Sequence, residues 1–166
     1  MRHKEIKLNL KFISLMLLNL FVAFSSSTSD TPNYIILEEH NLPEVLQETS
    51  GLYCPEVGSV FTINDSGNKS IIYNVDHTGH IMNEKIVAAK NKDWEALTGD
   101  DEYFYIGDIG NNNGKRQFVQ IYVVPKQGNN NESDMTSIKV SYINNSVKRN
   151  EYLDHDFDSE ALINVN

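Results

Sequence analysis

The feature that most constrains this chain is a succession of short apolar runs separated by clusters of glycine, asparagine and aspartate. The runs are rich in β-branched and aromatic residues, as is typical of strands, and they comprise residues 59–63, 70–75, 80–87, 103–106, 118–124 and 138–143. The segments between them, such as "NDSGN", "DHTG" and "GNNNGK", favour turns. No window has a sustained helical period, and "PEVLQE" (43–48) comes nearest. The sequence therefore predicts an all-β fold.

The strand-like segments also recur in a fixed order. The matching segments are "FTINDSGN" (61–68) with "FYIGDIGN" (104–111), "IIYNV" (71–75) with "QIYVV" (120–124), and "TSGL" (49–52) with "WEAL" (94–97) and "SEAL" (159–162). Four strands at a period of about 45 residues are typical of a β-propeller blade. We therefore expect a β-propeller-like chain, a partial propeller of about two four-stranded blades plus the first strand of a third. A β-sandwich whose strands look alike is the alternative.

Five of these motifs together resemble a known family. "ETSGL", "NDSGN", "DWEAL", "GDIGNN" and "DSEAL", in this order, are similar to the opening blades of secreted bacterial six-bladed β-propellers of the SdiA-regulated and esterase-like-phytase type, within the NHL and TolB-like group. The resemblance covers residues 37–164 and implies a propeller domain over 37–166. Chains of that family continue through further blades. We therefore expect an N-terminal fragment of a larger ring, with missing blades or self-association covering its open face.

The first residues have the three-part pattern of a secretory signal peptide. Basic residues precede 13 apolar residues, Phe12 to Phe24, and small residues follow. A membrane anchor is the alternative, but the run is shorter than the ~20 residues that span a bilayer. We expect residues 1–25 to be a signal peptide and 26–36 a linker, which makes the protein secreted or periplasmic with no stable membrane span.

The chain is acidic and has one cysteine. Its formal net charge is −9, and cleavage after Ser25 would remove four basic residues and one acidic residue, leaving −12. Such a surface repels nucleic acid, which excludes it as an expected partner, and it recruits cations. Cys54 has no partner for an internal disulfide, and we expect it to be a small buried residue in or beside a strand.

Four acidic residues are candidate metal ligands: Glu95, Glu160, Asp93 and Asp108. Glu95 and Glu160 open the first strands of successive units, whereas Asp108, like Asp65, follows a second strand. Because innermost propeller strands line a central channel, acids at corresponding strand ends are expected to gather at one mouth of it. Several oxygen ligands suit calcium, the expected cation. The alternative for Asp65 and Asp108 is a turn role, because aspartate before glycine satisfies its own turn backbone.

The motifs leave three functions open, and no catalytic residue is identified. The first is a secreted, calcium-binding module that interacts with a small-molecule or protein ligand of unknown identity. The second is a phosphate-ester hydrolase of the phytase or esterase-like type, which would need basic residues near the channel, where only Lys92, Lys115 and Arg116 lie near the motifs. The third is a truncated gene product without activity. No Gly-x-Ser-x-Gly elbow, phosphate loop or Cys-x-x-Cys pair occurs.

Overall fold

A computed structural model describes residues 35–128 and 134–165 of the chain. Residues 39–166 form one compact unit, Glu39–Asn166. The preceding unit, Met1–Glu38, is described only over residues 35–38, which are exposed and form neither helix nor strand. The predicted signal peptide, 1–25, and most of the predicted linker lie outside the described residues. Within the described part, no helix has the length and apolarity needed to cross a membrane.

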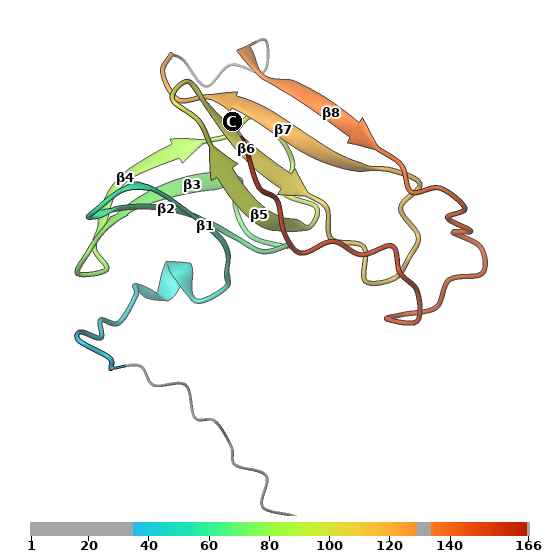
Figure 1. The fold of residues 1–166 in the computed structure, drawn as a ribbon, viewed down its shortest axis with the longest axis horizontal. Coiled ribbons are helices and arrows are strands. Elements are labelled where there is room, and N and C mark those ends of the chain that lie inside the picture. The colour runs from blue at the N-terminus through green and yellow to red at the C-terminus, as the bar shows by residue number, and fades with distance from the viewer. Residues whose placement is uncertain (1–34, 129–133, 166) are drawn as a thin grey trace, which may run out of the picture. The chain divides into compact units, whose positions relative to one another are not determined.

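The compact unit consists of two antiparallel four-stranded sheets, each with its strands in sequence order (Figure 1). The first sheet contains β1 (Thr49–Glu56), β2 (Ser59–Asn64), β3 (Ile71–Asp76) and β4 (Ile81–Ile86). The second sheet contains β5 (Trp94–Gly99), β6 (Tyr103–Asp108), β7 (Val119–Pro125) and β8 (Thr136–Val140). The one helix among the described residues is the short 3-10 helix η1 (Glu44–Leu46), within "PEVLQE". The prediction of an all-β fold is confirmed.

Aspartates and glycines form the tight turns between the strands. In the turn between β3 and β4, Asp76 Oδ1 accepts hydrogen bonds from the backbone N–H groups of Thr78 (2.9 Å) and His80 (3.0 Å). These bonds to the ionised carboxylate, with that from the Thr78 hydroxyl the largest effect, lower the pKa of Asp76 to about 2. Gly79 completes the turn with φ +89°, a backbone conformation that other residues rarely adopt. Turn chemistry in "DHTG" therefore sets where these strands end.

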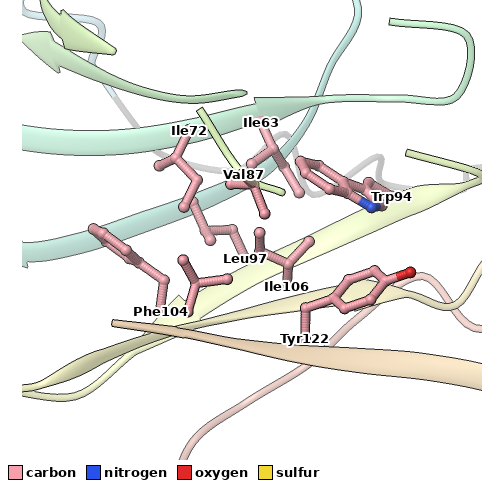
Figure 2. Packing of buried hydrophobic residues seen from close by; sticks show 9 residues of the cluster. Ile63, Ile72, Val87, Trp94, Leu97, Phe104, Ile106 and Tyr122 are labelled. Carbon is pink, nitrogen blue, oxygen red and sulfur yellow. The ribbon is translucent and has the colours of Figure 1, made fainter. Parts of the chain in front are cut away.

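The main hydrophobic core lies between the two sheets (Figure 2). It contains nine buried residues: Ile63, Ile72, Val87, Trp94, Leu97, Phe104, Ile106, Tyr122 and Val124. Trp94, Ile63 and Ile106 are fully buried. Each side chain of this size contributes about 1.5–3 kcal/mol when it is fully buried. This core joins the sheets into one unit.

The opposite faces of both sheets are partly covered by other segments of the chain. On β3, Ile72 belongs to the central core whereas Tyr73 packs with Leu46 of η1, so η1 covers the far face of the first sheet. On β5, Leu97 faces the central core whereas Ala96 packs in a cluster that includes Leu162 of the C-terminal segment. That segment therefore lies against the far face of the second sheet.

Two expectations about strands and burial are wrong. Residues 159–163, expected to open a third unit, form no hydrogen-bonded strand, because no further strand among the described residues pairs with them. Cys54 is exposed rather than buried, since it lies on β1 at a position that faces away from the core. The last strand, β8, is exposed along its whole length.

Candidate functional site

Three carboxylates from two segments of the chain meet near the ends of the two sheets. Asp65 directly follows β2, Asp93 directly precedes β5, and Glu95 is the second residue of β5. One carboxylate oxygen from each lies within 4.8 Å of the others, and all three residues are half-buried. These three residues are called the carboxylate cluster below. The sequence placed Asp93 and Glu95 in one site and treated Asp65 chiefly as a turn residue.

The side chain of Asn91 forms hydrogen bonds with both of the strand ends that carry the cluster. Its side-chain Nδ2 donates hydrogen bonds to the backbone oxygens of Asn64 (2.9 Å) and Asp65 (2.8 Å). Its Oδ1 accepts one from the N–H of Trp94 (3.2 Å), and the residue is only 6% exposed. A buried carboxamide with both ends bonded fixes the backbone around it, so Asn91 holds the end of β2 beside the start of β5. Sequence reasoning missed this residue, because nothing local to "KNKDW" indicates bonds to a segment more than twenty residues away.

Gly110 provides the space that the cluster occupies. A Cβ atom at this position would lie 2.5 Å from Asp93 Oδ2 and 2.5 Å from Glu95 Oε1, closer than real Cβ contacts allow. The backbone N–H of Gly110 also donates a hydrogen bond of 3.2 Å to Asp93 O. Gly110, the second glycine of "GDIGNN", is therefore required because two carboxylates approach its backbone closely. Inspection of the sequence could not supply this reason.

Burial, together with repulsion from neighbouring carboxylates, raises the pKa of Glu95 and Asp93. Burial is the largest cause of the raised pKa of Glu95, which is about 8, and the neighbouring carboxylates of Glu160, Asp65 and Asp93 raise it further. Burial also raises the pKa of Asp93, opposed by a hydrogen bond from Ser66 and by Arg116. A positive ion placed among like charges would reverse this effect, because it favours the ionised forms.

The C-terminal segment brings two further carboxylates to the same place. Glu160, which is exposed, lies close enough to hydrogen-bond Glu95, and Asp158 is near enough to raise the pKa of Asp93. The buried side chain of Asn111 positions this segment: its Nδ2 donates to Phe157 O (2.8 Å), while its backbone N–H donates to Asp158 Oδ1. The structure therefore brings Asp93, Glu95 and Glu160 together, as the sequence suggested.

Asp108 lies next to the cluster, but its carboxylate is bonded to groups outside the three clustered carboxylates. It is fully buried, and its Oδ1 is 2.9 Å from Arg116 Nη1 and 3.2 Å from the backbone nitrogen of Asp93, which donates to it. Its Oδ2 accepts a hydrogen bond from the Tyr122 hydroxyl (3.3 Å). Burial, followed by the charge of Asp108, raises the pKa of Tyr122 to about 12. Asp108 thus reaches the candidate site through the backbone of Asp93, and it does not belong to the group of three adjacent carboxylates.

A cavity of about 610 Å³ opens beside Asp93 and is lined by basic residues. Lys92, Lys115 and Arg116, the three cations that the sequence singled out, all contribute to its wall. Arg116 is held in place, since Nη1 donates to Gly110 O (2.7 Å) and Nη2 donates to Asp108 O (2.9 Å). Lys115 Nζ donates to Asn150 O. Positive and negative side chains therefore meet at Asp93.

Comparison of the chain with family models, with curated proteins and with solved structures finds no match. The function must therefore be inferred from the geometry of the site.

Proposed function

We propose that the chain is a calcium-binding module, with Asp65, Asp93 and Glu95 as ligands and Glu160 completing the set. The observation that carries the proposal is the convergence of three carboxylate oxygens, one from the end of β2 and two from the start of β5, within 4.8 Å of one another. Carboxylates held this close without a cation repel each other, and this repulsion adds to the effect of burial in raising the pKa of Glu95. Asp108 supports the site by accepting the Asp93 N–H.

The ligand types favour a hard cation. The cluster and the residues beside it offer carboxylate oxygens, with no cysteine or histidine among the three. Calcium accepts six to eight oxygen ligands in flexible geometry, whereas zinc prefers four ligands that include nitrogen or sulfur. Glu160 is exposed to solvent, and water would supply the remaining ligands.

Calorimetric titration of the purified chain with calcium chloride tests this proposal. We expect Glu95→Gln to weaken binding at least about tenfold, which corresponds to about 1.4 kcal/mol. The matched control is Glu84→Gln, which changes an exposed glutamate on β4 that is not part of the cluster. Equal calcium affinity in wild type and Glu95→Gln would contradict the proposal that the cluster binds calcium.

The architecture that we propose around this site is a partial propeller of the SdiA-regulated and esterase-like-phytase type. Each sheet is a four-stranded antiparallel meander, and the similar segments "FTI" and "FYI" lie on β2 and β6, the second strand of each. The first strands approach closely: Ser50 Oγ donates to Trp94 O (2.6 Å), and a Cβ at Gly51 would lie 2.6 Å from Leu97 N. This supports β1 and β5 as neighbouring innermost strands.

The C-terminal segment forms no strand, but it contacts β5 in the position that the next unit of the series would take. Leu162 packs with Ala96 of β5, and Asn164 Nδ2 donates to Gly99 O (3.4 Å), so the segment follows β5 as β5 follows β1. On the same segment, Ile163 and Val165 are each 80% exposed. We propose that further blades, or self-association, cover this face. Sedimentation of the purified chain tests this, because a monodisperse monomer that does not bind a hydrophobic dye would contradict it.

A second candidate function, phosphate-ester hydrolysis with calcium, is favoured by the basic cavity beside Asp93. Lys92, Lys115 and Arg116 would attract a phosphate to the edge of the cluster, where calcium would bridge it to the protein. The bonds that Arg116 makes to Gly110 and Asp108 reduce its capacity to bind a substrate, which is why this function is second. Calcium-dependent hydrolysis of p-nitrophenyl phosphate, lost in Lys92→Gln, would establish it. Absence of hydrolysis at saturating calcium would eliminate it.

The proposed setting of the module is outside the cytoplasm, where calcium is abundant. The motive is the basic and then apolar start of the chain, residues 2–24. N-terminal sequencing of the native protein should find residues 1–25 removed, and an intact Met1 in the cytoplasm would contradict export.

A further inference from the structure

A second cavity, of about 230 Å³, lies between the two sheets and does not include the carboxylate cluster. Its apolar wall is formed by Phe61 of β2, Ile72 of β3 and Phe104 of β6, and the two phenylalanine ring centroids are 4.9 Å apart. Phe104 pairs with Gly99 at one end of β5, whereas Glu95 lies near the other end. The cavity and the cluster are therefore separate sites.

The rim of this cavity carries positive charge and carboxamide groups. Lys85 of β4 and Lys126, which directly follows β7, line it together with Asn74 and Asn83, which are paired in register across β3 and β4. None of the residues that line the cavity is acidic. The two charged residues that line the cavity are therefore both basic, in a chain whose net charge is −9. The chemistry of the rim selects for an anion.

Lys126 is held at the cavity by aromatic rings. Its Nζ lies 4.9 Å from the ring centroid of Tyr53 and 5.2 Å from that of Phe104, and it donates a hydrogen bond of 3.3 Å to Tyr53 Oη. Its backbone N–H is fixed by Glu102 O at 2.8 Å. Among the described residues, no carboxylate forms an ion pair with Lys126. Ring faces position the ammonium at the cavity. Hydrogen bonds lower the pKa of Asp100, and the charge of Lys126 helps to lower it further.

We propose that this cavity binds a small organic monocarboxylate with an aromatic or branched aliphatic body. The carboxylate would lie between Lys85 and Lys126, accept hydrogen bonds from the two asparagine side chains, and place its apolar body against Phe61, Ile72 and Phe104. A volume of 230 Å³ equals that of about eight water molecules at ~30 Å³ each, which suits a ligand of about ten non-hydrogen atoms. The space is smaller than the ~300–1,000 Å³ of sites for drug-sized molecules.

Binding of phenylacetate to the full chain tests the proposal, with phenylacetamide as the uncharged ligand of the same shape. Titration followed by the NMR signals of Ile72 and the cavity phenylalanines should give phenylacetate a dissociation constant at least about tenfold lower than that of phenylacetamide. This comparison uses wild-type protein and does not depend on the folding of a variant. Equal affinity for the two compounds, or no binding of phenylacetate, would overturn the proposal.

A pair of lysine variants locates the charge that binds. Lys126→Gln should weaken phenylacetate binding about tenfold. The matched control is Lys139→Gln, because Lys139 Nζ also lies over an aromatic ring, that of Phe118 at 4.7 Å, outside this cavity. Lys139→Gln should leave the affinity unchanged, and so should Glu95→Gln, which lies in the separate cluster. Unchanged affinity in a folded Lys126→Gln variant would contradict the assignment.

Discussion

Asp108 and the carboxylate cluster lie next to each other but have opposite electrostatic surroundings. Asp108 is fully buried beside Arg116 and Tyr122, so every oxygen of its carboxylate has a partner. Asp93 and Glu95 are half-buried beside further carboxylates, and the pKa of Glu95 is raised to about 8, first by burial and then by this repulsion. A paired acid stabilises the fold, whereas acids held together against their repulsion store free energy that a cation can release.

The largest effect on stability is expected for a substitution of Asp108, the acid that is paired with Arg116. Asp108→Asn would leave the guanidinium of Arg116, which is 20% exposed, without its counter-charge and would weaken the bond to the Asp93 N–H. We expect the free energy of unfolding to fall by about 3 kcal/mol, the lower end of the range for breaking a buried ion pair. Urea denaturation measures it. A loss below about 0.5 kcal/mol would mean that the pair behaves like an exposed one.

The next effect is expected at the glycine beneath the cluster. Gly110→Ala places a methyl group 2.5 Å from carboxylate oxygens of Asp93 and Glu95, so one of these side chains must move. We expect calcium binding to weaken at least about tenfold, with a stability loss of about 1–3 kcal/mol, typical of overpacking. Calorimetry and urea denaturation separate the two effects. Wild-type calcium affinity in this variant would show that the carboxylates need not approach each other to bind.

The smallest effect is the pH dependence of stability without calcium. Since the folded-state pKa of Glu95 is about 8 and its ordinary value is 4.5, the folded state binds more protons between these values. Stability should therefore fall as pH rises from about 4.5 to 8, and it should then level off. Because Glu95 is only half-buried, solvent screens its charge and the loss should be only about 1 kcal/mol. Melting temperatures of wild type and Glu95→Gln in a chelator should show the slope in wild type alone, and parallel curves would contradict the repulsion.

The fold was more predictable from the sequence than the site. Six of the eight strands lie within a few residues of predicted runs, because β-branched clusters and Gly/Asn/Asp turns are local signals. The pairing of Asp108 with Arg116 was not predicted, because it depends on a loop folding back over the end of β6. Asp65 joins the cluster through Asn91, and this long-range carboxamide bridge leaves no trace in local composition. Strand ends could be predicted, but the side chains that meet there could not.

We expect calcium to bind where Glu95 and its neighbouring carboxylates repel each other. Calorimetric titration with calcium at pH 7, repeated in two buffers of different ionisation enthalpy, counts the protons released on binding. Since the pKa of Glu95 is about 8, the group is mostly protonated at this pH and must lose its proton to become a ligand. We predict release of close to one proton per calcium ion in wild type and none in Glu95→Gln. Tight calcium binding without proton release would place the ion elsewhere, and no binding at all would contradict the claim outright.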